Sequence, residues 1–155
     1  MPSKENLIYI ELKDGIVKIK MRPDLAPMHV KRIKELVSEK FYDGLPFHRV
    51  IEGFMAQTGD PLKDGTGGSG QKLQAEFSDE KHLRGTLSMA RSMDPDSADS
   101  QFFICFDDAP WLDNQYTIWG KVVEGMEYVD NIKKGSNNNG EVLSDPDVIV
   151  RMYTD

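Results

Sequence analysis

Short apolar segments separated by glycines and polar loops restrict the fold of this chain more than any other feature. The segments that read as strands are 7–13, 17–22, 47–51, 54–57, 85–90, 101–106, 117–123 and 148–153. Two further segments, 26–41 and 124–134, carry apolar residues at helical spacing. Many short strands with two helices favour a mainly β fold, a closed antiparallel barrel, because closure removes exposed sheet edges.

The clearest predicted element is a β-hairpin near the amino terminus. Its apolar positions are Ile8, Ile10 and Leu12 before the turn and Val17, Ile19 and Met21 after it. This alternation on both sides of Asp14-Gly15 is a strong hairpin signal. Two unrelated strands are the alternative reading.

The longer helical segment predicts an amphipathic helix that covers a core. Its apolar stripe is Ala26, Val30, Ile33, Val37 and Phe41. Pro23 and Pro27 lie at its start, where proline is tolerated.

Length and charge limit the class of protein. The chain has 155 residues, of which 39% are hydrophobic, so we expect one domain over residues 1–155. Its net charge of −7 disfavours nucleic acid as a partner and suits a monomer in solution. No segment resembles a signal peptide or approaches the ~18 apolar residues of a membrane span. We therefore expect a cytoplasmic protein without a membrane partner.

Familiar catalytic motifs offer little support for a hydrolase or a metalloenzyme. Residues 65–70 spell G-x-G-x-x-G, but without the flanking strand and helix of a dinucleotide site we expect a turned loop. The three histidines lack metal-ligand spacing, so no metal or cofactor is expected. His48 is read as structural and His82, in a polar stretch, as a surface residue. Cys105 lies in an apolar strand and is expected to be buried and inert.

One arginine, Arg49, stands in an apolar strand. Its sequence neighbourhood holds Phe54, Met55, Phe102, Phe103, Trp111 and Leu112, punctuated by Gln57 and Gln101. The pattern alone favours core residues and an arginine whose head reaches solvent. Without a nucleophile or a carboxylate pair, any chemistry here has to work by shape and polarisation.

The chain resembles the cyclophilins, a family of peptidyl-prolyl cis–trans isomerases. Residues 47–60 (FHRVIEGFMAQTGD) are similar to the signature segment of that family. The likeness continues in order through 65–68, 76–77, 85–90, 100–104, 111–113 and 120–122. Residues 89–98 (MARSMDPDSA) and the short chain are similar to the bacterial-type branch.

The resemblance implies an eight-stranded antiparallel barrel capped by two helices, with a substrate groove on its outer face. It implies an enzyme that accelerates rotation about X-Pro bonds in polypeptides and assists protein folding, with no cofactor. Arg49 and Gln57 match catalytic positions of the family. The implied substrate-binding residues are Phe54, Met55, Ala90, Arg91, Gln101, Phe103, Trp111, Leu112 and Tyr116. Trp111 also matches the tryptophan that contacts cyclosporin, so cyclosporin binding is expected.

Two positions depart from the pattern of many family members. Arg91 stands in place of an asparagine whose contact is largely through the backbone, so we expect binding to survive with an altered rim charge. Tyr116 stands in place of a histidine, and an aromatic ring with a polar edge can still wall a pocket. Two alternatives stay open: a proline-peptide binding module or chaperone with little catalysis, and a barrel that carries a small hydrophobic ligand inside.

Overall fold

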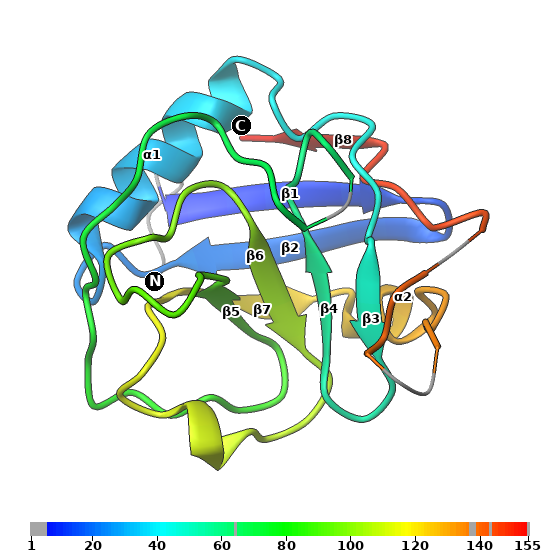
Figure 1. The fold of residues 1–155 in the computed structure, drawn as a ribbon. Coiled ribbons are helices and arrows are strands. Elements are labelled where there is room, and N and C mark those ends of the chain that lie inside the picture. Colours follow the sequence, from blue (N-terminus) through cyan, green and yellow to red (C-terminus); the bar gives the residue numbers. More distant parts are fainter. Residues whose placement is uncertain (1–5, 64, 137–138, 143, 155) are drawn as a thin grey trace.

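Eight antiparallel strands form one sheet that curls around a buried core (Figure 1). The computed structural model describes residues 6–154 except 64, 137–138 and 143. The strands are β1 (Leu7–Leu12), β2 (Gly15–Met21), β3 (Arg49–Ile51), β4 (Met55–Thr58), β5 (Thr86–Met89), β6 (Phe102–Cys105), β7 (Ile118–Glu124) and β8 (Arg151–Tyr153). Their order across the sheet is β3-β4-β6-β5-β7-β2-β1-β8. The expected mainly β fold with eight antiparallel strands is confirmed.

The closure of the barrel is less complete than the sequence suggested. β3 and β8 are the two edges of the sheet, and no ladder joins them within the described ranges. The gap is crossed by irregular backbone, with isolated bridges between Pro46 and Val148 and between Arg49 and Glu141. The edge strands have only three residues each. The segment that precedes β8 therefore supplies the other backbone hydrogen bonds between the two edges of the sheet.

The hairpin of β1 and β2 is confirmed, with its turn one residue earlier than expected. Leu12 pairs with Gly15, so Lys13 and Asp14 form the turn and Gly15 begins β2. A Cβ atom on Gly15 would lie 2.5 Å from the ring of Tyr128. The glycine therefore lets the segment after β7 pack directly against the hairpin.

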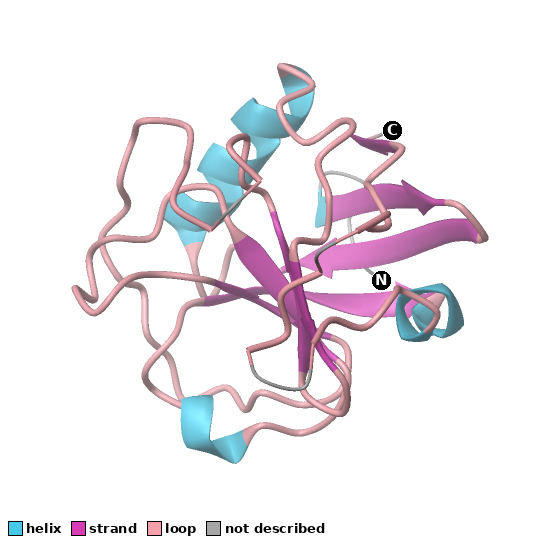
Figure 2. Cartoon of the chain, turned by 45° about the vertical axis from the view of Figure 1, so that its right-hand side comes forward, coloured by secondary structure: helices cyan, strands magenta, loops and turns pink. Residues whose placement is uncertain are grey.

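Two α-helices flank the sheet, as expected. Helix α1 (Pro27–Ser38) lies at the top of the molecule, and the short α2 (Met126–Asp130) follows β7 (Figures 1 and 2). A 3-10 helix over Pro110–Leu112, at the opposite end from α1, was not expected. Among the helices of the described part of the chain, none has the length and apolarity to cross a membrane.

Large side chains fill the inside of the curled sheet. Trp119, Tyr42, Phe47 and Phe102 are almost completely buried there, packed among branched aliphatic residues. Interiors packed in this way hold few voids larger than a water molecule. The filled interior argues against the alternative of a hydrophobic ligand carried inside the barrel.

Candidate active site

Strands β4 and β6 divide their apolar side chains between two faces of the sheet. Ala56 and Ile104 point into the main core, whereas Met55, Phe103 and Cys105 belong to a second, smaller cluster. This follows from the alternation of side chains along a strand. The second cluster gives the outer face of the sheet an apolar surface beside the edge strand β3.

A cavity of about 350 Å³ opens over this second cluster, and we call it the apolar pocket. Its lining residues are Arg49, Phe54, Met55, Gln57, Ala90, Arg91, Phe103, Trp111, Leu112 and Tyr116. A neighbouring cavity of about 330 Å³, the polar pocket, shares Gln57, Ala90 and Arg91 with it and adds Gln101 and Lys72. The structure therefore brings together every site residue predicted from the sequence.

A chain of hydrogen bonds fixes the side chain of Arg49. Arg49 pairs with Gln57 across the β3–β4 ladder, and its Nη1 lies 3.5 Å from Gln57 Oε1. Gln57 Nε2 donates to Gln101 Oε1 at 2.8 Å. On its other side, Arg49 Nε donates to the carbonyl of Asn139 at 2.8 Å. The guanidinium is thus held at both ends at the edge of the apolar pocket.

The glycine-rich loop anchors the far end of this chain. Gln101 Nε2 lies 3.1 Å from the carbonyl oxygen of Gly65 and 2.9 Å from that of Gly67. Asp60 accepts hydrogen bonds from backbone N–H groups at the start of the loop, and Asp99 from those at its end. The loop reading of 65–70 is confirmed. Sequence reasoning missed the two aspartates, because their partners are defined only by the folded loop.

One wall of the apolar pocket is aromatic. The Tyr116 ring meets the Phe103 ring edge to face at 5.9 Å and the His82 ring at 6.5 Å. His82 also stacks behind Phe103 at 6.3 Å. The expectation that His82 lies at the surface is wrong, since the residue is only 1% exposed.

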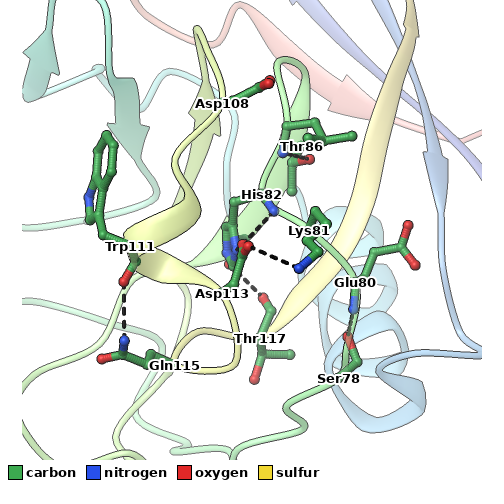
Figure 3. A network of polar contacts seen from close by, with 12 residues as sticks. Ser78, Glu80, Lys81, His82, Thr86, Asp108, Trp111, Asp113, Gln115 and Thr117 are labelled. Carbon is green, nitrogen blue, oxygen red and sulfur yellow. Dashed lines mark hydrogen bonds and ion pairs between the residues drawn. The ribbon is translucent and has the colours of Figure 1, made fainter.

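His82 is buried because partners distant in the sequence satisfy its polar atoms (Figure 3). Its Nδ1 lies 3.1 Å from Asp113 Oδ1, and its Nε2 lies 2.9 Å from Ser88 Oγ. Burial lowers the pKa of His82, and the carboxylate of Asp113 opposes that shift. The backbone N–H of His82 in turn lowers the pKa of Asp113. A neutral ring therefore backs the pocket near neutral pH.

Cys105 and His48 have the environments expected of structural residues. Burial raises the pKa of the Cys105 thiol to about 12, which keeps it protonated and unreactive. His48 is also buried, beside the edge strand. Within the described ranges, no three His, Cys, Asp or Glu side chains lie where they could hold a metal ion.

Comparisons with known proteins agree with this geometry. Residues 7–154 match the family model described as cyclophilin type peptidyl-prolyl cis-trans isomerase/CLD. A probable peptidyl-prolyl cis-trans isomerase of Brucella suis is 54% identical over 159 residues, covering 95% of this chain and 81% of that protein. Peptidyl-prolyl cis-trans isomerase B of Bacillus subtilis is 40% identical over 140 residues, covering 88% and 94%.

Solved structures point the same way. A Cryptosporidium parvum cyclophilin type peptidyl-prolyl cis-trans isomerase, crystallised in the presence of the dipeptide Ala-Pro, superposes with a TM-score of 0.87 and 29% identity. The alignment covers 96% of this chain and 98% of that one. The family match, the close relatives and the shared fold together show that this chain belongs to the cyclophilin-type peptidyl-prolyl cis-trans isomerases.

Proposed function

We propose that the apolar pocket binds the proline ring of exposed X-Pro segments and that Arg49 is the catalytic residue. The observation that carries the proposal is the position of the Arg49 guanidinium, fixed by Gln57 and Asn139 beside a pocket of apolar side chains. A proline ring is small, apolar and without an N–H, so it suits a pocket floored by Phe103, Met55 and Leu112.

The reaction requires polarisation of the X-Pro peptide bond and needs no covalent intermediate. Rotation about a peptide bond costs about 18–20 kcal/mol, because resonance gives the bond partial double-bond character. In the twisted transition state that conjugation is lost, and the prolyl nitrogen regains its lone pair. A hydrogen bond donated to this nitrogen is stronger in the transition state than in the planar ground state, and such differential binding lowers the barrier.

Arg49 has the donor that this step needs. Its Nε and Nη1 bond to Asn139 and Gln57, while its Nη2 makes no hydrogen bond to the described part of the chain. Arginine stays charged at any physiological pH, so the donor is always present. Each ~1.4 kcal/mol of transition-state stabilisation raises the rate about tenfold.

The apolar floor strengthens this contact. Phe103, Met55 and Leu112 are each at least nine-tenths buried, so a seated proline ring displaces water from the bond that rotates. Electrostatic interactions strengthen as water is excluded. Gln57 and Gln101 line the groove beside the pocket, where their amides are positioned to bond the substrate backbone as well as each other.

The isomerisation of an Ala-Pro peptide tests this proposal. We expect the protein to accelerate cis-to-trans conversion and Arg49→Ala to lose most of kcat/KM while its circular dichroism spectrum stays unchanged, because Arg49 is exposed. An Arg49→Ala variant as fast as the parent would refute the role of Arg49. Exchange NMR separates catalysis from the alternative of a binding module, since a module binds the peptide without accelerating cis–trans exchange.

We also propose that the chain binds cyclosporin and acts as a monomer. Trp111 is 58% exposed at the rim of the apolar pocket, with its ring 5.4 Å from that of Phe54, so it offers an open aromatic face to a large ligand. All the proposed site residues come from one chain. Calorimetry should show binding at micromolar cyclosporin that Trp111→Ala weakens, and sedimentation should show a single copy. No heat of binding, or a stable dimer, would contradict these expectations.

A further inference from the structure

The two positions at which the sequence departs from the family pattern contact each other. The guanidinium carbon of Arg91 lies over the ring of Tyr116, 4.7 Å from its centroid. A cation at this distance from the face of an aromatic ring is attracted by the electrons of the ring. The sequence suggested only a change of rim charge at Arg91, whereas the structure shows its side chain folded onto the pocket wall.

Hydrogen bonds fix Arg91 in this position. Its Nε and Nη2 both donate to the carbonyl oxygen of Gln115, at 3.0 and 2.8 Å, and its Nη1 donates to the carbonyl of Ser92 at 2.9 Å. The side chain therefore ties the segment that carries Tyr116 to the loop after β5. Lysine could not reproduce this pattern, because it lacks the planar fork of donors.

Tyr116 connects the fixed Arg91 side chain to other residues of the apolar pocket. One face of its ring meets Arg91, and its contacts with Phe103 and His82 are edge-to-face, at 82° and 83° between ring planes. Gln115 donates from Nε2 to the carbonyl of Trp111 at 3.1 Å, which links the same segment to the rim (Figure 3). Arg91, which itself lines the apolar pocket, thus supports both its wall and its rim.

We propose that Arg91 is a positioning residue that clamps Tyr116 in place as the wall of the apolar pocket. This inference rests on the proposed function, because it concerns how firmly the pocket is formed before substrate arrives. A wall that is already fixed loses less side-chain freedom on binding, which strengthens substrate affinity. The guanidinium of Arg91 already donates to the carbonyls of Gln115 and Ser92, so the clamp acts on binding and leaves the rotation step to Arg49.

The test compares binding with catalysis in the full-length protein. We expect Arg91→Ala to raise the Kd of an Ala-Pro peptide about three- to tenfold, since a cation–ring contact and an arginine hydrogen bond are lost together. Exchange NMR should show the on-enzyme cis–trans rate changed by less than about twofold, as for loss of uniform binding. Arg91→Lys should leave the Kd raised, because the charge alone does not form the clamp.

A second set of variants isolates the Arg91–Tyr116 contact. Arg91→Ala should raise Kd by a similar factor in the parent and in a Tyr116→Phe background, which keeps the ring face. In a Tyr116→Leu background the factor should be about two- to fivefold smaller. Arg151→Ala is the matched control, because Arg151 lies 4.0 Å over the Tyr153 ring on β8, outside both pockets.

Several results would overturn the clamp. One is that Arg91→Ala changes Kd equally in the Tyr116→Leu background and in the parent. Another is that Arg91→Lys retains the full affinity of the parent. The third is that Arg151→Ala changes Kd as much as Arg91→Ala does. If the parent neither binds nor isomerises the peptide, the proposed function fails on its own. The Tyr116 ring resonances then still test the clamp: Arg91→Ala should shift and broaden them, and unchanged sharp signals would refute it.

Discussion

The side-chain amide of Gln57 donates a hydrogen bond to Oε1 of Gln101 across 2.8 Å. Gln101 turns its oxygen toward Gln57 because its own amide nitrogen faces the carbonyls of Gly65 and Gly67. Gln57 in turn presents its oxygen to Arg49. The glycine loop therefore sets the orientation of both amides and, through them, of the guanidinium.

This orientation predicts the effect of Gln101→Leu. Without the Gln101 acceptor, the Gln57 amide is free to flip and to turn its N–H groups toward the Arg49 donors. A hydrogen bond to a charged group contributes about 1.5–3 kcal/mol, so we expect kcat/KM for an Ala-Pro peptide to fall about tenfold or more. Gln74→Leu, at an exposed position, is the control. Equal activity of the two variants would show that the relay does not orient Arg49.

Charge around the two pockets predicts a preference among peptides. Arg49, Lys72 and Arg91 make no ion pair with any described residue, although the chain as a whole carries a net charge of −7. Among the described residues that line the polar pocket, Asp99 is the only carboxylate, and backbone and hydroxyl donors already surround it. The surface around the apolar and polar pockets is thus a local positive region on an acidic protein.

We therefore expect a proline peptide with a glutamate near the proline to show a KM about two- to fivefold below that of its lysine counterpart at low salt. The difference should shrink at about 0.5 M salt, where the Debye length is only a few ångströms. Lys72→Ala should reduce it, whereas Lys18→Ala, on the hairpin, should not. A KM difference independent of salt would show that charge does not cause it.

Local patterns predicted the strands well, because apolar alternation is a property of neighbouring residues. Ile8, Ile10, Val17 and Ile19 are fully buried, as the hairpin pattern requires. The site residues came from the resemblance rather than from periodicity, since nothing local distinguishes Arg49 from an arginine at an ordinary edge strand. The structure added the contacts that tie these residues together.

The failures of sequence reasoning share one physical cause, which is pairing between groups that lie far apart in the sequence. His82 follows Glu80 and Lys81 and so looks exposed, but Asp113, 31 residues later, covers it. The incomplete barrel closure has the same origin, because irregular backbone around Glu141 takes the place of a regular ladder. No local pattern encodes such pairings.

Two of the three buried histidines, His29 and His82, predict how stability depends on pH. Burial lowers the pKa of His29 and of His82, and Glu76 and Asp113 oppose the shift. A histidine in the unfolded chain titrates near pH 6.5. Below that pH the two histidines therefore bind protons in the unfolded state that they do not bind in the folded state. The contribution of the two neutral histidines to the free energy of unfolding is complete above about pH 6.5. It is lost as the pH falls through their lower pKa in the folded state.

We expect the free energy of unfolding in urea to fall between about pH 7 and about pH 5, by at most about 1.4 kcal/mol per pH unit for each histidine. The carboxylates with lowered pKa, such as Asp113, change the free energy of unfolding only at more acidic pH. His82→Gln and His29→Gln should each flatten the slope. A stability that rises on acidification, or slopes that neither variant changes, would contradict this account.

Glu76 caps helix α1 from a distant loop, and its removal should destabilise the fold more than a surface carboxylate would. The helix has no side-chain cap of its own, and the Glu76 carboxylate accepts hydrogen bonds from the backbone N–H groups of Met28 and His29 at 3.3 and 2.8 Å. It also pairs with Nδ1 of His29 at 2.6 Å. Glu76→Ala leaves these donors without an acceptor inside the protein.

Loss of such a cap costs about 1–2 kcal/mol, and the buried His29 partner places Glu76→Ala at the upper end of that range. Glu76→Gln keeps an acceptor and should lose less. Glu80→Ala is the matched control, because Glu80 lies in the same loop and its carboxylate, 3.7 Å from Arg22, forms only an exposed ion pair. Urea unfolding at about pH 7.5, where both histidines are neutral, measures the three variants without the pH effect. If Glu76→Ala and Glu80→Ala lost equal stability, the distant cap would contribute no more than a surface ion pair.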